Sequence, residues 1–226
     1  MRHRFIVGGT LLAGALILLS VTAWVAFPGN DSLELPVPLK AYNTQSLAER
    51  DYAKDFASLA QGFRPQSYRS FCGPATLATV LRAYGVASSD QTSVFPHFSS
   101  RLKAFYSGMK LAELNGLAQS AGLSTELVYA DSLSLDDFRE RLKTNLARAG
   151  DFVIVNYDRR VLGQAGAGHI SPVAAYDPAE DSFLVLDEAA YRYPFTWVPA
   201  ALLYAAARTQ DGDRFRGVLF VRGYSP

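Results

Sequence analysis

The sequence predicts a single α+β domain, because segments with the apolar spacing of helices come mostly first and short β-rich runs come mostly last. The chain has 226 residues, of which 49% are hydrophobic and 19% are charged, a composition typical of a globular protein with a sizeable core. Its 22 basic and 21 acidic residues nearly balance, so it lacks the positive excess of a nucleic-acid binder. One cysteine and three histidines exclude an intrachain disulfide and a cysteine-rich structural zinc site.

The N-terminal segment is apolar and follows a positively charged start. No charged side chain occurs in residues 5–27, and Arg2 and Arg4 precede this run. A helix needs about 20 apolar residues to cross a bilayer core, whereas the apolar part of a signal peptide has about 7–15. We therefore predict that residues 1–27 are an inner-membrane anchor and that the following domain faces the periplasm. The alternative is a signal segment cleaved after Ala23, with the domain secreted to the periplasm.

The rest of the chain divides into a linker, residues 28–40, and one domain, residues 41–226. Three prolines interrupt any helix or central strand in the linker. Within the domain, apolar spacing predicts helices at residues 46–61, 72–84, 110–120 and 135–148, the last capped by Ser134. The β-rich runs predict strands at residues 126–129, 152–157, 171–176, 183–187 and 217–222. We expect the helices and the sheet to form two layers.

The lone cysteine, Cys72, stands at the start of a predicted helix. Pro74 suits the first helical turn, and Leu77, Val80 and Leu81 repeat at helical spacing behind it. The free N–H groups and the dipole of a helix N-terminus stabilise a thiolate, which is the nucleophile in cysteine acyl transfer. On position alone, a small buried structural cysteine is the stronger interpretation.

A predicted hairpin strengthens the catalytic interpretation. If its turn is centred on Pro178, His169 lies opposite Asp187, and cross-strand partners have Cβ atoms about 4.5–5.5 Å apart. A carboxylate that orients an imidazole is what a Cys–His nucleophile pair requires. A slip of one residue would put the two side chains on opposite faces, so the prediction depends on this register.

Three further features flank these residues. Gln66 lies six residues before Cys72, close enough to donate to a developing oxyanion together with the Cys72 N–H. The glycine-rich segment 163–168 lacks the strand and Lys-Ser/Thr context of a phosphate loop, so we expect it to give the backbone freedom beside His169 for substrate approach. His97 lies in a turn-like stretch with no acidic residue opposite it, and we interpret it as structural or exposed.

Three motifs in order resemble the catalytic domain of phytochelatin synthases, a papain-like cysteine protease fold. They are Gln66-Ser-Tyr-Arg-Ser-Phe-Cys72-Gly-Pro, then Val155-Asn-Tyr-Asp-Arg159 with Gly163-Gln164 and Gly168-His169-Ile-Ser-Pro172, then Leu186-Asp187 with Tyr193-Pro-Phe-Thr-Trp197. The resemblance runs from about Leu35 to Val221. It implies a helical layer that carries the nucleophile and packs on an antiparallel sheet.

The resemblance implies a glutathione γ-glutamylcysteinyltransferase with a Cys–His–Asp triad. Such an enzyme attacks the Cys–Gly amide of glutathione, releases glycine, and passes the γ-Glu-Cys acyl group to a second glutathione or to water. In this chain Cys72 would be the nucleophile, His169 the general acid and base, Asp187 its orienting carboxylate and Gln66 the oxyanion donor. The implied substrate-binding residues are Arg159, as a glutathione-carboxylate contact, with Gln164, Gly168, Arg192 and Tyr193.

The chain also departs from the family pattern. Ala190 stands where the family commonly has an arginine three residues after the aspartate, and Pro74 replaces an aliphatic residue. The first change weakens recognition of an acceptor glutathione, so we expect hydrolysis at least as much as polymer synthesis, with Arg192 as a partial substitute. We expect no cofactor and no metal site of its own. Cd²⁺ or Zn²⁺ would enter as a thiolate complex of the substrate.

Two other functions stay open from the sequence. One is a papain-like peptidase that acts on other peptides, and the other is an inactive membrane-anchored domain used for binding. We expect a glutathione-like thiol peptide as partner, the membrane through the N-terminal helix, and no nucleic acid. A homodimer is left open.

Overall fold

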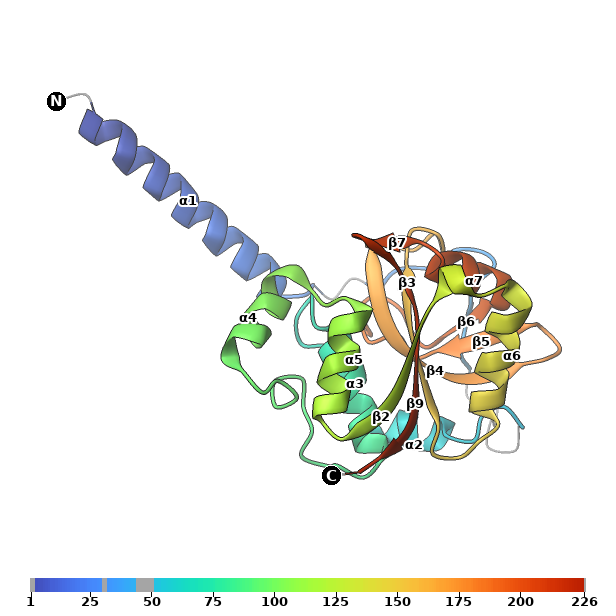
Figure 1. Ribbon diagram of the computed structural model, residues 1–226. Coiled ribbons are helices and arrows are strands. Elements are labelled where there is room, and N and C mark those ends of the chain that lie inside the picture. The colour runs from blue at the N-terminus through green and yellow to red at the C-terminus, as the bar shows by residue number, and fades with distance from the viewer. Residues whose placement is uncertain (1–2, 30–31, 44–50, 226) are drawn as a thin grey trace.

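The computed structural model describes residues 3–29, 32–43 and 51–225, with side chains from residue 14 onward. In this part of the chain, seven α-helices accompany a seven-stranded antiparallel sheet, which confirms the predicted α+β class (Figure 1). The helices are α1 His3–Ala26, α2 Phe56–Gly62, α3 Cys72–Ala83, α4 Phe98–Ser107, α5 Leu111–Ser120, α6 Leu135–Leu146 and α7 Ala200–Ala207.

The large sheet has the strand order β1-β6-β5-β4-β3-β9-β2. Its strands are β1 Lys40–Ala41, β2 Leu123–Tyr129, β3 Phe152–Asp158, β4 Gly168–Asp177, β5 Ser182–Val185, β6 Thr196–Pro199 and β9 Gly217–Tyr224. A separate two-stranded ribbon pairs β7 Gln210–Asp211 with β8 Arg214–Phe215. Strands β4, β3 and β9 are neighbours in this order, and most of their residues are buried.

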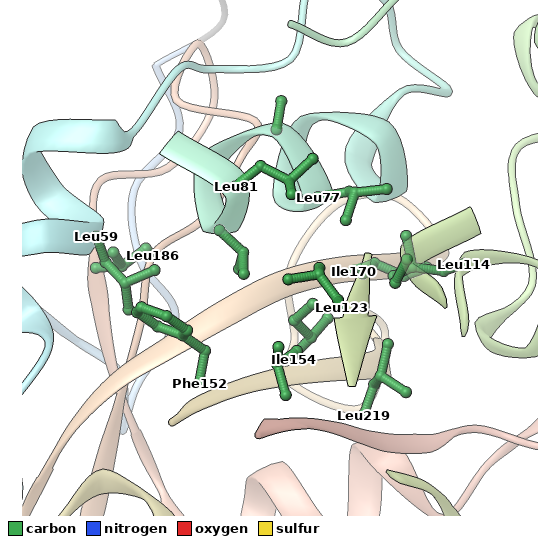
Figure 2. Close-up of a cluster of buried hydrophobic side chains, with 14 of the residues drawn as sticks. Leu59, Leu77, Leu81, Leu114, Leu123, Phe152, Ile154, Ile170, Leu186 and Leu219 are labelled. Atoms are coloured by element: carbon green, nitrogen blue, oxygen red, sulfur yellow. The ribbon is translucent and has the colours of Figure 1, made fainter. Parts of the chain in front are cut away.

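Helices cover both faces of the sheet, so the predicted two-layer arrangement is wrong. Helices α2, α3 and α5 pack on one face with Ile154, Ile170 and Leu219 (Figure 2). Helices α6 and α7 cover the other face, against Val153 and Phe220. Because both faces are buried, β3 is buried along its whole length instead of alternating between core and solvent.

Most predicted elements occur, with shifted ends. The helix over 110–120 appears as α5 and the helix over 135–148 as α6, where Ser134 and Asp137 form the expected capping box. Of the helix predicted over 46–61, residues 44–50 lie outside the described chain and α2 starts at Phe56. The turn-like stretch at His97 leads directly into α4, which the sequence analysis missed.

The N-terminal helix projects from the body of the domain (Figure 1). Its C-terminal end contacts the domain, since Val25 is 3% exposed and its carbonyl accepts the backbone N–H of Arg69. Among the residues that the structure describes, no helix is long and apolar enough to cross a membrane. The anchor proposed for residues 1–27 stays a prediction.

The segment predicted as a linker packs onto the domain. Leu39 is buried in the core beside α7, and the Leu33 N–H donates to the carbonyl of Arg192. Pro36 lies against Gly163, where a Cβ would come within 3.2 Å of the proline ring. Residues 32–40 thus hold one side of the loop that precedes His169.

Candidate active site

Cys72 is the first residue of α3 and is almost completely buried. Its thiol lies beside the backbone of Ile170 on β4, the residue after His169. One turn along α3, the Thr76 hydroxyl donates to the Ile170 carbonyl at 3.1 Å and fixes the helix against the strand. Burial raises the pKa of the Cys72 thiol, against the opposing effects of this backbone contact and of the Arg159 charge.

His169 and Asp187 lie together, as the sequence predicts, but not by the predicted pairing. His169 Nε2 is 3.0 Å from Asp187 Oδ1, without the alignment of a hydrogen bond. The hairpin pairs Tyr176 with Phe183, and a bulge then shifts the register so that Val173 opposes Val185. Because the true turn lies later than Pro178, the predicted register is wrong.

Strand β5 ends two residues before Asp187, and the turn of the chain after the strand places the Asp187 carboxylate next to His169. The chain leaves the strand after Val185, and the Leu186 N–H still donates to the Pro172 carbonyl at 2.9 Å. Asp187 then turns its side chain toward His169, and its Oδ1 accepts the N–H of Ala189 at 2.8 Å. The contact therefore comes from a bulge and a strand end rather than from a ladder pair.

Arg159 is the strongest partner of Asp187. Its Nη2 donates to Asp187 Oδ1 at 2.6 Å, and its Nη1 donates to Gln164 Oε1 at 3.0 Å. Arg159 is 3% exposed and Asp187 is 1% exposed, so this is a buried ion pair. Burial raises the pKa of Asp187, but the charges of Arg159 and His169 outweigh it and hold the pKa below the usual range.

His169 is neutral in this setting. Burial lowers its pKa to about 4, helped by the charge of Arg159 and opposed by Asp187. The edge of its ring also meets Tyr157 at a centroid distance of 5.6 Å. With the pKa of Cys72 raised and that of His169 lowered, the thiol and the imidazole are both uncharged near neutral pH, and the imidazole can accept a proton.

A second buried carboxyl group, Glu188, follows the aspartate, and the sequence analysis missed it. The Thr79 hydroxyl donates to its Oε1 at 3.1 Å, and its Oε2 has no hydrogen-bond partner among the described residues. Burial raises its pKa well above the ordinary value, and the charge of Asp187 adds to this. Cys72, Thr76 and Thr79 recur at helical spacing on α3, so the carboxyl lies against the same helix as the nucleophile.

A hollow of about 260 Å³ opens beside His169. Residues from four parts of the chain line it: Trp24; Gln66 and Arg69; Arg159 with Ala165–His169; and Ala189, Tyr191 and Arg192. The loop 165–168, which consists of alanine and glycine, forms part of this wall, and its use for substrate approach stays a prediction. Trp24, Arg69 and Tyr191 were not predicted.

Gln66 lies in this wall, but its amide is occupied. Its Nε2 donates to the carbonyls of Tyr68 and Arg69, both at 2.9 Å, while its Oε1 has no partner among the described residues. The backbone N–H of Gln66 donates to the Glu188 carbonyl at 2.8 Å. The loop before α3 is thus tied to the segment that carries Asp187.

The predicted substrate-binding residues take two kinds of position. Arg159, Gly168 and Arg192 line the hollow, whereas Tyr193 lies behind it, with its hydroxyl bound by the Ala165 N–H at 2.8 Å. Gln164 is buried behind it as the partner of Arg159. A side chain at Gly168 would collide with the guanidinium of Arg216, since a Cβ would lie 2.6 Å from its Nη1.

His97 lies apart from Cys72, His169 and Asp187. His97 precedes α4 and lines a different hollow, with Pro96 and Lys103. Within the described ranges, no group of three or more His, Cys, Asp or Glu residues is placed to hold a metal ion. The structure places His169 and Asp187 together, with Cys72 at the start of α3 next to the strand that carries His169.

A sequence model of phytochelatin synthase matches residues 40–218. The chain belongs to the phytochelatin synthase family. The match contains every predicted site residue from Gln66 to Tyr193, and the resemblance seen in the three motifs is confirmed at the level of the family. Helix α1, with Trp24, lies outside it.

The chain is also similar to several glutathione gamma-glutamylcysteinyltransferases. Glutathione gamma-glutamylcysteinyltransferase 3 of Lotus japonicus is 30% identical over 178 residues, covering 75% of this chain and 36% of the relative. The glutathione gamma-glutamylcysteinyltransferase of Schizosaccharomyces pombe is 30% identical over 161 residues, covering 67% and 39%. A wheat glutathione gamma-glutamylcysteinyltransferase 1 is 31% identical over 165 residues, covering 69% and 33%. The chain thus spans little more than a third of the length of these relatives.

Proposed function

We propose that this protein is a cysteine-dependent acyltransferase that takes the γ-glutamylcysteinyl group from glutathione and releases glycine. The observation that carries the proposal is the His169–Asp187–Arg159 cluster beside a cysteine at a helix N-terminus, with Nε2 of the histidine 3.0 Å from the aspartate. Membership of the phytochelatin synthase family supports glutathione as the substrate. The relatives named above carry this activity in their names.

In the first half-reaction, Cys72 Sγ forms a bond to the carbonyl carbon of the Cys–Gly amide. His169 takes the thiol proton during the attack, because both groups are neutral beforehand. The tetrahedral intermediate collapses with loss of the C–N bond, and the imidazolium gives its proton to the departing glycine amine. The product on the protein is a γ-Glu-Cys thioester.

Asp187 and Arg159 serve the transient imidazolium. Asp187 stays ionised, so its charge stabilises His169 when the proton arrives, and Arg159 fixes the carboxylate in place. For Gln66 to donate to the oxyanion, its Nε2 must leave one of the two carbonyls that it binds in the free protein.

In the second half-reaction, water or the amine of a second glutathione attacks the thioester carbonyl. His169 accepts the proton of the attacking group, and the sulfur leaves with a proton returned by the imidazolium. Water as acceptor gives γ-glutamylcysteine, and glutathione as acceptor gives a peptide one γ-Glu-Cys unit longer. Ala190 is exposed and offers no charge to an acceptor, which favours hydrolysis.

Heavy-metal ions enter this proposal only as part of the substrate. The described residues hold no cluster of metal-binding side chains, so Cd²⁺ or Zn²⁺ would arrive bound to the thiol of glutathione. A thiolate complex blocks the substrate sulfur without touching the amide that Cys72 attacks.

The test is mass spectrometry of products after the full chain is incubated with glutathione, with and without Cd²⁺. We expect glycine and γ-glutamylcysteine in equal amounts. Cys72→Ser should form no product above the uncatalysed background. Longer γ-Glu-Cys peptides as the main product would refute the preference for hydrolysis, and equal turnover by the Cys72→Ser variant would refute the mechanism.

A second set of substrates separates the proposal from a general peptidase. An α-linked Glu-Cys-Gly peptide has the same composition as glutathione but lacks the γ-linkage. Turnover of the α-linked peptide alone would overturn glutathione as the substrate while leaving the Cys72 mechanism in place. Binding of glutathione without turnover of either peptide would indicate an inactive binding domain.

A further inference from the structure

Two arginines in the active-site hollow carry charge that no acidic side chain in its described lining neutralises. The lining contains Arg69, Arg159 and Arg192, and neither aspartate nor glutamate. Arg159 already binds Asp187, which leaves Arg69 and Arg192. The chain as a whole has 22 basic and 21 acidic residues, so this excess is a local arrangement and not a consequence of composition.

Many other arginines of the domain have a carboxylate partner. The pairs are Arg139 with Asp136 and Asp181, Arg141 with Glu126, Arg148 with Asp151, Arg160 with Asp158, Arg216 with Asp211, and Arg222 with Glu126 and Asp151. Among the described residues, Arg69 and Arg192 make no such pair. Two unpaired guanidinium groups around one hollow repel each other unless an anion lies between them.

Arg69 is held in place by the C-terminal end of α1. Its Nε donates to the Trp24 carbonyl at 2.8 Å, and its guanidinium carbon lies 5.0 Å from the centre of the Trp24 ring. On its other side, Tyr191 lies 6.0 Å away. Both Nη atoms lack hydrogen-bond partners in the described chain. The guanidinium group is therefore held through its Nε, and its two Nη atoms are available to bind a ligand.

Arg192 lines the same hollow and lies near the same tyrosine, 5.7 Å from the centre of the Tyr191 ring. Its Nε is buried without a partner among the described residues, and its Nη1 lies against Gly166, where a Cβ would come within 3.4 Å. Tyr191 lies close enough to these arginines for their charges to affect its pKa. Burial raises the pKa of its hydroxyl, and the charges of Arg192, Arg69 and Arg159 lower it. Arg69 and Arg192 both line the hollow beside His169.

We propose that Arg69 and Arg192 together bind a carboxylate of the peptide substrate, and that Trp24 of α1 positions Arg69 for this. The inference rests on the proposed function, since glutathione carries two carboxylates. A guanidinium fork binds a carboxylate through two charge-assisted hydrogen bonds, and the half-buried wall shields them from water. Trp24 lies outside the matched range 40–218, so helix α1 would contribute to substrate binding here (Figure 1).

The test compares Arg69→Ala and Arg69→Lys with wild type on three substrates. These are glutathione, its glycine amide, and glutathione with the γ-glutamyl α-carboxylate amidated. Arg69→Ala should raise KM for glutathione about tenfold with kcat within about twofold, and Arg69→Lys should restore part of the loss. The penalty should disappear for the one analogue that lacks the carboxylate bound by Arg69.

Arg208→Ala is the matched control, because Arg208 is exposed at the end of α7, outside the hollow, and stacks only on Tyr204. It should leave KM unchanged. An unchanged KM in Arg69→Ala, or the same increase with all three substrates, would overturn the proposal, since the second result means that Arg69 only shapes the hollow.

Calorimetry separates this inference from the proposed reaction. Glutathione is titrated into Cys72→Ser and into Cys72→Ser with Arg69→Ala. A Kd that is about tenfold weaker in the double variant supports carboxylate binding even if the wild type turns out not to cleave glutathione. Equal Kd values, or no binding to Cys72→Ser, would overturn the inference.

Discussion

Asp187 and Glu188 are neighbours in the chain and equally buried, yet their pKa values are shifted in opposite directions. Asp187 faces Arg159 and His169 on the sheet side, and these charges keep its pKa low in spite of burial. Glu188 faces Thr79 on α3, and one hydroxyl does not replace the water lost on burial, so its pKa is raised. The neighbours of each side chain, and not the depth of burial, decide the direction in which its pKa is shifted.

The two carboxyl groups affect different neighbours. Asp187 is an anion that stabilises charge on His169, and it depends on Arg159 for its own stability. Glu188 lies near Cys72, and its charge contributes to the raised pKa of the thiol. The raised pKa of Glu188 limits this effect, because it favours the uncharged form of the carboxyl.

Of the substitutions that test the difference between Asp187 and Glu188, removal of Arg159 should have the largest effect on stability. Arg159→Ala leaves Asp187 as an unpaired buried charge, so we expect the free energy of unfolding to fall by about 3–5 kcal/mol, as measured by urea denaturation. Arg69→Ala is the matched variant, because Arg69 is half-buried and has no carboxylate partner among the described residues. It should cost about 1 kcal/mol or less. Equal losses in the two variants would contradict the assignment of Arg159 as the ion-pair partner.

The pH dependence of turnover tests the protonation state of His169, the neighbour of Asp187. His169 must be neutral to accept the thiol proton, and burial lowers its pKa to about 4. The value of kcat/KM should therefore stay level as pH falls from 7 and drop only as pH falls through about 4. A profile of kcat/KM in overlapping buffers checks this, with stability followed at each pH by circular dichroism. An acid limb at or above the ordinary histidine value of 6.5 would contradict the neutral resting state.

Substitution of Glu188 should give the smallest effect, visible only as a function of pH. The folded state holds its proton above the pH of about 4.3 at which the unfolded carboxyl ionises, so the stability from this group is complete below that pH and is lost as pH rises. Glu188→Gln has no proton to lose. Its free energy of unfolding relative to wild type should increase with pH, by at most about 1.4 kcal/mol per pH unit.

Urea denaturation of both proteins at pH 5 and pH 7 measures this difference, and groups common to both cancel. Thr79→Val is the companion variant, expected to cost about 1 kcal/mol at either pH through the lost hydrogen bond. A constant difference between wild type and Glu188→Gln would show that Glu188 is ionised in the folded protein.

The sequence predicted the elements that carry the site better than it predicted how they meet. Local signals suffice for α3, with Pro74 in its first turn, and for α6, with its capping box. The hairpin register depended on where the chain turns, and neither the later turn nor the bulge after Val173 leaves a local signal. His169 and Asp187 still met, because the strand end replaced the predicted ladder pair.

The chain sequence by itself determined which chemistry is available. With one cysteine, Cys72 is the one thiol available as a nucleophile, and the motifs around it, His169 and Asp187 predicted the family. Only the tertiary structure decided that Arg159 is bound to Asp187, that Glu188 is buried, and that Trp24 and Arg69 reach the same hollow as Arg192. The reason is physical: side-chain type is local, whereas charge state and partnership depend on neighbours that the fold brings from distant parts of the chain.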